Sequence, residues 1–168
     1  MPILSDTNTL TNSYNYKVFK ELYENNVSTL SILFKGASSL SNDDIKLSER
    51  LYIPGKRLRG FETGKIGPKD GNDFIGGNYV SSINATTTIP TLLENVQSVD
   101  VVLFADAANI WGVDYDSSLD NNGIRSSVGI GIDWLTPVGP LTFSFAHPVT
   151  KEPTDIEQTF RFNIGTSF

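Results

Sequence analysis

The residues with the clearest chemical potential lie in one long, glycine-rich segment and on a strand-like segment that follows it. Arg59 stands beside Gly60 and Phe61, which places a planar cation with several N–H donors next to an aromatic ring. A guanidinium away from bulk water needs a carboxylate, because an unpaired buried charge is costly. Asp106 is the candidate partner, since alternation places it on a polar face with Phe104 two residues before it. We therefore predict a docking ion pair.

Composition gives little support to catalytic or metal chemistry. The chain of 168 residues has no Cys and a single His, so a Cys-based zinc site is excluded and a multi-His site cannot form. Asp114, Asp116 and Asp120 do not have the ligand spacing of an EF-hand, and we expect them in a solvated loop. A net charge of -6 and a pI near 4.7 argue against nucleic-acid binding. We expect no enzymatic activity, no metal, no cofactor and no nucleic-acid partner.

The elements that must position these residues have the period of two that is typical of β-strands. Residues 159–168 alternate throughout, with Phe160, Phe162, Ile164 and Phe168 on one face and polar or small residues on the other. No stretch approaches the roughly 18 consecutive apolar residues of a transmembrane helix, so any membrane crossing would use strands. The same alternation predicts about six further strands, at residues 14–23, 27–34, 79–89, 99–106, 124–134 and 141–146.

A strand of alternating residues has one apolar and one polar face, so its two faces must contact different environments. Two architectures provide this. A soluble sandwich would bury the aromatic face against a second sheet, whereas an outer-membrane barrel would turn it to lipid and keep the polar face in the lumen. The order of the connections favours an all-β, antiparallel transmembrane β-barrel, because short periplasmic turns alternate with long extracellular loops in such barrels. Here the shorter linkers are 24–26, 90–98 and 136–140, and the longer ones are 36–77, 112–123 and 148–158.

Aromatic residues near the predicted strand ends are a second observation on the same question. They favour the interfacial girdle of a barrel, with large core residues as the alternative for the two Trp side chains. These residues are Tyr79, Trp111, Trp134 and Phe168.

The loop at residues 36–77 is unusual in its length. A loop of about forty residues without secondary structure is uncommon and is usually functional or disordered. Its glycines permit turns with positive φ, and Pro54 and Pro68 stiffen it, so its composition does not indicate disorder. We predict that it folds back into a lumen and docks there. Its other charges, Lys56, Arg57 and Lys65, are expected to be solvated.

Several spaced motifs resemble the C-terminal barrel half of the BamA family of outer-membrane protein assembly factors, in the bacterial surface antigen superfamily. The resemblance covers nearly the whole chain. It is carried by Leu58 to Phe61, by Ile66, Gly67 and Pro68, by residues 76–78, by Phe104 to Asp106 with Trp111, by Trp134 with residues 137–140, and by the Phe-Asn-Ile-Gly run at 162–165.

The resemblance implies a sixteen-stranded barrel, of which residues 1–168 would form the C-terminal part with about seven strands. It implies that residues 36–77 are an extracellular loop folded into the lumen, that Arg59 is the loop arginine, and that Asp106 is its partner. The family pattern there is Phe-x-Asp-x-Gly, and this chain has Ala108 in place of the glycine. That departure puts the local packing in question more than the ion pair.

The function implied by the resemblance is the folding and insertion of other barrels into the bacterial outer membrane through a lateral seam. The expected partners are the lipid bilayer, nascent outer-membrane proteins and assembly-complex lipoproteins. The remaining strands, the periplasmic POTRA domains and an export signal would lie upstream. The terminal strand, with Phe160, Phe162, Ile164 and Phe168, would form one side of the seam and also resembles a C-terminal targeting signal.

Two other functions remain open on the sequence. A translocation-assembly or two-partner-secretion barrel of the same superfamily also carries the Arg-Gly-Phe loop, and the number of upstream POTRA domains would distinguish it. A soluble β-sheet binding domain is the alternative from another class. It would be monomeric in water without detergent.

Overall fold

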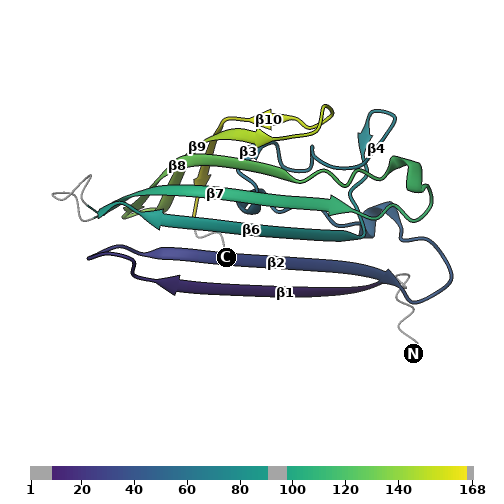
Figure 1. Cartoon of the computed structure of the whole chain (residues 1–168), viewed down its shortest axis with the longest axis horizontal. Coiled ribbons are helices and arrows are strands. Elements are labelled where there is room, and N and C mark those ends of the chain that lie inside the picture. The colour runs from purple at the N-terminus through teal and green to yellow at the C-terminus, as the bar shows by residue number, and fades with distance from the viewer. Residues whose placement is uncertain (1–8, 91–97, 166–168) are drawn as a thin grey trace.

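A single antiparallel sheet of seven strands, in the order β1-β2-β6-β7-β8-β9-β11, dominates the computed structural model, which describes residues 9–90 and 98–165 (Figure 1). Each strand pairs with its neighbour in chain order, apart from short elements in the connections. The prediction of an all-β antiparallel fold with about seven strands is confirmed. The strands are β1 (Thr9–Lys20), β2 (Ser28–Ser39), β6 (Tyr79–Thr88), β7 (Val99–Trp111), β8 (Arg125–Thr136), β9 (Gly139–Thr150) and β11 (Phe160–Ile164).

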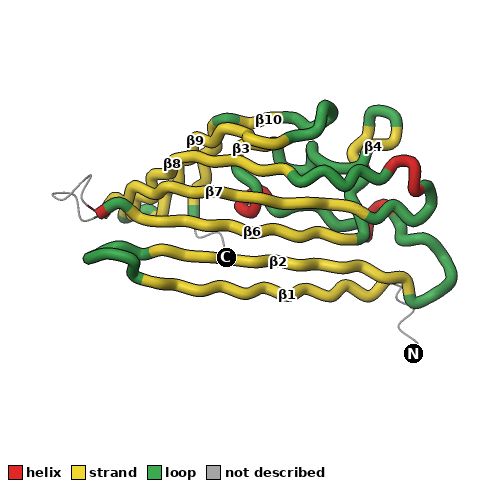
Figure 2. The backbone as a smooth tube through the Cα atoms, viewed as in Figure 1, coloured by secondary structure: helices red, strands yellow, loops and turns green. Residues whose placement is uncertain are grey.

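The sheet is curved and open in the part of the chain that the structure describes (Figure 2). β1 and β11 form its two edges, and among the described strands each is hydrogen-bonded to one neighbour. Between the long strands lie short elements, namely η1 (Leu47–Glu49), η2 (Gly55–Arg57), β3 (Gly60–Phe61), β4 (Lys69–Asp70), β5 (Asp73–Phe74), η4 (Ser117–Leu119) and β10 (Glu157–Gln158).

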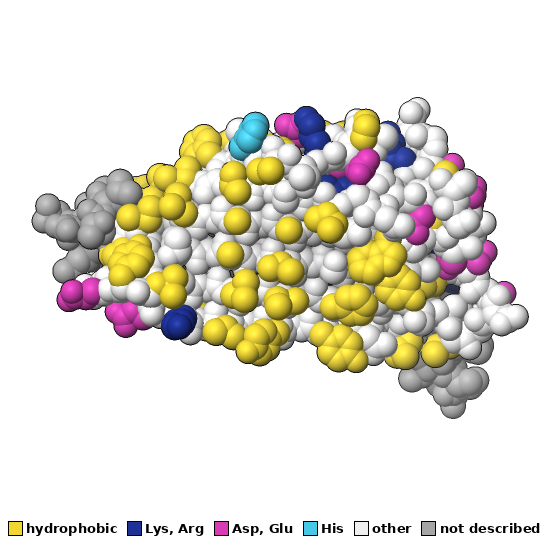
Figure 3. Space-filling view, in the orientation of Figure 1, with side chains coloured by type: hydrophobic (Ala, Val, Ile, Leu, Met, Phe, Trp, Pro, Cys, Tyr) yellow, Lys and Arg dark blue, Asp and Glu magenta, His cyan; other side chains and the backbone are white. Residues whose placement is uncertain are grey.

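The outward face of the sheet is apolar and uncovered. Tyr16 on β1, Trp134 on β8 and Phe145 on β9 keep 62%, 44% and 50% of their surface exposed. Hydrophobic side chains are spread over this face of the sheet, and charged ones lie mostly toward its margins (Figure 3). A soluble sandwich would need a second sheet here, and the described residues supply none. An apolar surface of this extent is what a lipid-facing sheet requires.

The two ends of the sheet differ in their connections. Residues 21–27 and 137–138 turn at one end, while residues 40–78, 112–124 and 151–159 form longer connections at the other. Aromatic rings lie at the end with the long connections, where Tyr79 and Trp111 stack at a centroid distance of 5.7 Å. The helices among the described residues are too short and polar to cross a membrane.

Several strands are longer than the sequence predicts, and β2, β7 and β9 differ most. β7 continues to Trp111 rather than ending at residue 106. β2 continues to Ser39 and β6 starts at Tyr79, so the long loop comprises residues 40–78 rather than 36–77. β9 runs past Pro148 to Thr150, which shortens the connection predicted at 148–158. Proline cannot donate a ladder hydrogen bond, and the β8–β9 register shifts between Ser126 and Ser127, opposite this proline. The irregularity accommodates a residue that otherwise suggests a strand end.

A charge on the outward face should be far more damaging than a charge on the inward face. We expect Ile130→Lys, on the outward face of β8, to lower the free energy of unfolding by about 2–4 kcal/mol in a bilayer, because a cation near the lipid midplane is costly. The measurement is urea unfolding of the full-length protein in lipid vesicles.

The matched control is Asp133→Lys, on the inward face of the same strand and opposite Asp100 on β7. It should change stability by no more than about 0.5 kcal/mol. Equal losses in the two variants would contradict the assignment of the faces.

Candidate functional site

The long loop crosses the inward face of the sheet and is held there by a hydrophobic cluster. The loop contributes Ile53, Leu58, Phe61 and Ile66, all nearly inaccessible to solvent. Val80 on β6 with Ala108 and Ile110 on β7 complete the cluster from the sheet. The Ala108 methyl group, which replaces the glycine of the family pattern, is therefore packed against the docked loop. Burial of these side chains supplies much of the free energy that keeps a long loop ordered.

Two loop glycines allow the close approach that docking requires. Gly60 has a φ of 92°, and a Cβ there would lie 3.2 Å from the Cβ atoms of both Ser127 and Ala146. Gly67 has a φ of 101°, and a Cβ there would lie 2.5 Å from Ile110 Cγ2. Both positions thus need the backbone freedom and the small volume of glycine. Pro68, next to Gly67, is fully buried.

Arg59 and Asp106 are joined by a bidentate ion pair. Arg59 Nε donates to Asp106 Oδ2 and Nη2 donates to Oδ1, each at 2.7 Å, and the Arg59 backbone N–H donates to Oδ2 at 3.1 Å. The Asp106 side chain is 0% exposed and that of Arg59 is 19% exposed. The guanidinium also lies 3.5 Å from the ring centroid of Phe104, in a cation–π contact. The structure thus brings together three residues that the sequence proposed as interacting.

The ion pair lies on a row of polar side chains that crosses three strands. Asn84 on β6, Asp106 on β7 and Ser127 on β8 are direct neighbours in register. Asn84 Nδ2 donates to Asp106 Oδ1 at 2.8 Å, and Ser127 Oγ donates to the Arg59 carbonyl oxygen. The carboxylate therefore has several donors, as a buried anion requires. Asn84 and Ser127 escaped prediction because strand register cannot be read from one strand's alternation.

Arg57 is bound to the sheet, so our expectation that it is a solvated loop charge is wrong. Its Nη1 donates to Ser31 Oγ at 2.6 Å and to Asn84 Oδ1 at 3.2 Å, and its Nη2 donates to Asn15 Oδ1 at 2.8 Å. Burial lowers the pKa of Arg57, while the charge of Asp106 raises it. The guanidinium still remains a cation at neutral pH. The loop tip is consequently tied to β1, β2 and β6 as well as to β7.

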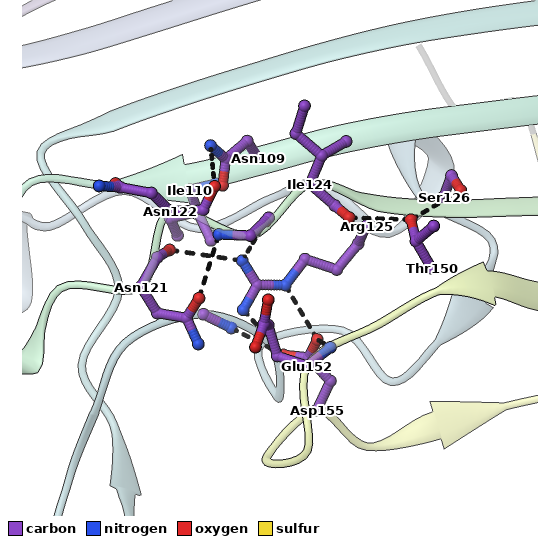
Figure 4. Close-up of polar contacts among 12 residues, drawn as sticks. Asn109, Ile110, Asn121, Asn122, Ile124, Arg125, Ser126, Thr150, Glu152 and Asp155 are labelled. Carbon is purple, nitrogen blue, oxygen red and sulfur yellow. Dashed lines mark hydrogen bonds and ion pairs between the residues drawn. The ribbon is translucent and has the colours of Figure 1, made fainter.

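A second, fully buried ion pair holds the connection between β9 and β11 (Figure 4). Arg125 Nε donates to Asp155 Oδ2 at 2.9 Å, and both side chains are 0% exposed. Arg125 Nη1 donates to the Gly123 carbonyl oxygen at 2.6 Å. Asp155 also accepts from the backbone N–H groups of Glu152 at 2.8 Å and of Gly67 at 3.3 Å. This pair joins the 151–159 connection to the long loop, and no motif in the sequence pointed to it.

Asp114 anchors the beginning of the long loop to the connection after β7. Its Oδ2 accepts from the Ile45 backbone N–H at 2.7 Å, and it forms an ion pair with Arg50. Burial acts to raise the pKa of Asp114, but hydrogen bonds from Ile45 and Asn78 and the charge of Arg50 lower it overall. The carboxylate is therefore stabilised in its ionised form.

The neighbouring carboxylates have separate local roles. Asp116 accepts from the Ser118 backbone N–H at 2.9 Å, and Asp120 accepts from the Gly112 backbone N–H at 3.0 Å. Within residues 9–90 and 98–165, no group of three or more His, Cys, Asp or Glu side chains is placed to hold a metal ion.

The terminal-strand residues lie apart from the ion pair. Phe160, Phe162 and Ile164 are on the outward face of β11 and are exposed. Phe160 packs on Phe145 and Phe162 on Phe143 of β9, each with a ring centroid distance of 4.9 Å. Phe168 lies outside the described residues. Their role in a seam or as a targeting signal stays a prediction.

Comparison with known proteins places these features in a family context. The family model described as the Omp85 superfamily domain matches residues 2–168. The chain is 32% identical over 154 residues to the outer membrane protein assembly factor BamA of Neisseria meningitidis serogroup B, which covers 74% of this chain and 19% of that protein. It is 29% identical to BamA of Nitratidesulfovibrio vulgaris, with 99% of this chain and 21% of that protein covered. It thus spans about a fifth of the length of these relatives.

Similarity extends to a eukaryotic protein and to a solved structure. A SAM50-like protein of Schizosaccharomyces pombe is 27% identical, with 83% of this chain and 31% of that protein covered. The crystal structure of BamA from Haemophilus ducreyi lacking POTRA domains 1–3 has a TM-score of 0.84 and 26% identity, and the match covers 96% of this chain and 35% of that chain. The open sheet therefore has the fold of part of a BamA barrel.

Loss of the Arg59 side chain should undock the loop. Arg59→Ala leaves the buried Asp106 carboxylate without its cation, and removing one partner of such a pair costs about 3–5 kcal/mol. We expect limited proteolysis of the full-length protein in vesicles to cleave residues 40–78 faster in this variant. The control is Lys56→Ala, which removes an exposed charge from the same loop. Identical cleavage in Arg59→Ala and the parent protein would refute docking by the ion pair.

Acid should release the beginning of the long loop. The folded pKa of Asp114 is lower than its ordinary value of 3.8, so its stabilising contribution is present above that value and is lost as pH falls through the lowered pKa. We expect hydrogen exchange at the Ile45 amide to accelerate over that acidic range. Asp114→Asn should remove this pH dependence; its persistence in that variant would show that another group controls the segment.

Proposed function

Because the chain belongs to the Omp85 superfamily, we propose that it is part of a β-barrel that folds and inserts other β-barrel proteins into an outer membrane. The BamA relatives are membrane assembly factors, not enzymes, and the barrels of the superfamily lie in outer membranes. The observation that carries the proposal is the match of 96% of this chain to part of a BamA barrel, with a TM-score of 0.84. The proposed location is the bacterial outer membrane, in line with the BamA relatives.

The proposed mechanism depends on an exposed strand edge. A backbone N–H or C=O group in lipid has no water to bond, so an unpaired edge is costly and readily pairs with an incoming strand. β11 is hydrogen-bonded to β9 alone among the described strands. We infer that its other edge forms one side of a lateral seam, where the terminal strand can template a nascent strand by β-augmentation. Strand exchange of this kind needs no nucleotide and no metal.

The docked loop supports the proposal by giving the inward face a fixed arrangement. We infer that residues 40–78 are an extracellular loop folded into the barrel lumen and that the Arg59–Asp106 pair keeps it there. The alternative is that the Arg59–Asp106 ion pair only stabilises the fold and has no role in the mechanism. The proposed partners are the lipid bilayer, nascent outer-membrane proteins and assembly-complex lipoproteins.

A translocation-assembly or two-partner-secretion barrel is the second candidate within the same superfamily. The names of the relatives favour assembly over transport, since the matched proteins of Neisseria meningitidis and Nitratidesulfovibrio vulgaris are each named outer membrane protein assembly factor BamA.

Assembly activity can be measured directly with purified components. We expect the full-length protein that contains this chain, reconstituted in vesicles, to accelerate the folding of an added, urea-denatured outer-membrane barrel. Heat-modifiable migration on a gel reports the folded product. Arg59→Ala should slow this reaction about tenfold, equivalent to about 1.4 kcal/mol, if docking positions the seam.

Two comparisons make the result decisive. Vesicles without the protein give the uncatalysed rate, and Lys56→Ala should match the parent. An unaccelerated reaction with the parent protein would overturn the assembly proposal. Full activity of Arg59→Ala with an undocked loop would leave assembly in place and restrict the ion pair to a structural role.

A further inference from the structure

Arg161, on the inward face of β11, ties the terminal strand to the docked loop. Its Nη2 donates to the Phe61 carbonyl oxygen at 2.6 Å, and its Nη1 donates to the Gly55 carbonyl oxygen. Phe61 and Gly55 lie on opposite sides of Arg59 in the chain, so one guanidinium spans the loop tip. The planar guanidinium has several N–H donors that point in different directions, so it can donate to two carbonyl groups at separate positions.

The segment that leads into β11 is paired with the same loop. β10 pairs antiparallel with β3, with Glu157 opposite Phe61 and Gln158 opposite Gly60. Backbone hydrogen bonds extend the contact, since Glu62 N–H donates to the Ile156 carbonyl oxygen at 2.8 Å and Ile156 N–H donates to that of Lys65 at 3.0 Å. Gln158 Oε1 accepts from Arg161 Nη2 at 3.1 Å and so links this short ladder to the terminal strand.

Among the residues that the structure describes, the attachment of β11 to the sheet is short by comparison. There, β11 and β9 share five register pairs with one further backbone hydrogen bond at each end, whereas β1 and β2 share twelve pairs. A short ladder resists sliding and fraying less well than a long one, because each lost pair is a larger fraction of the whole. The contacts to the loop consequently make up a substantial part of what holds the terminal strand in place.

We propose that Arg161 is a positioning residue that couples the terminal strand to the loop, so that the edge of β11 keeps its register only while the loop is docked. Undocking of the loop removes the Gly55 and Phe61 carbonyl acceptors and releases the strand. The consequence for substrate insertion rests on the proposed function. If β11 forms one side of the seam, holding it in register keeps its backbone N–H and C=O groups at fixed positions for pairing with an incoming strand. The coupling itself is a property of this chain.

Hydrogen exchange of the full-length protein in vesicles tests the coupling. Arg161→Gln should raise the exchange rate of the amides at residues 156–162 about tenfold, the size expected for the loss of charge-assisted hydrogen bonds. Arg161→Lys keeps the charge but cannot span both carbonyl groups, so its effect should be intermediate. This variant also preserves the test if Arg161→Gln does not fold. The control, Asn163→Gln, lies two residues further on the same face and should match the parent.

A double-mutant cycle separates coupling from a merely local contact. Arg59→Ala should accelerate exchange at 156–162 in the parent protein and add little in the Arg161→Gln background, because the two changes remove the same connection. Additive effects, or unchanged exchange in both Arg161 variants, would overturn the proposal.

Assembly is measured on the same preparations so that the two proposals can fail separately. Coupled exchange with no assembly activity in the parent would overturn the proposed function and leave the coupling intact. Normal assembly by the parent, with additive exchange effects, would overturn the coupling alone.

Discussion

The buried carboxylate of Asp106 is the interaction on which the arrangement of the inward face depends. A carboxylate with a fully inaccessible side chain cannot be solvated by water, so its charge must be met by protein donors. Arg59 supplies three of them and Asn84 a fourth. Because Arg59 lies in the middle of the long loop, satisfying one anion on β7 also fixes the position of a segment whose order is supported by the hydrophobic cluster.

The loop in turn connects parts of the sheet that are far apart in the strand order. Arg57 reaches Asn15 on β1, Arg59 reaches β7, and Arg161 on β11 reaches back to the loop from the opposite edge. The hydrophobic cluster around Phe61 supplies non-directional burial, and the hydrogen bonds of the guanidinium groups set the position of the backbone. One loop thereby braces a curved sheet whose outward face is not covered by any of the described residues, and lipid is the proposed neighbour there.

Much of the fold could be predicted because each strand carries its own pattern. Phe160 and Phe162 fall together on one exposed face, as their local alternation assigns, and the order of short and long connections indicated the barrel. The strand end at Pro148 was wrong, because a register irregularity opposite it lets β9 continue. Within the site, Arg59 and Asp106 could be paired by charge and face alone. Arg57 could not be distinguished from a solvated loop cation, because its partners Asn15, Ser31 and Asn84 come from three different strands.

By itself, the sequence determined the alternating strands and the family resemblance, since these depend on residue types within short motifs. Arg59 and Asp106 are 47 residues apart, but the charge of each and the motif around each were enough to pair them. Only the tertiary structure decided the register that sets Asn84, Asp106 and Ser127 in one row, the Arg125–Asp155 pair, and the contact of Arg161 with the loop. Arg125 and Asp155 are 30 residues apart in the chain, and Arg161 and Phe61 are 100 apart. Neither contact belongs to a recognisable motif, so each is set only by how strands pair and how a loop folds back across them, which no local pattern encodes.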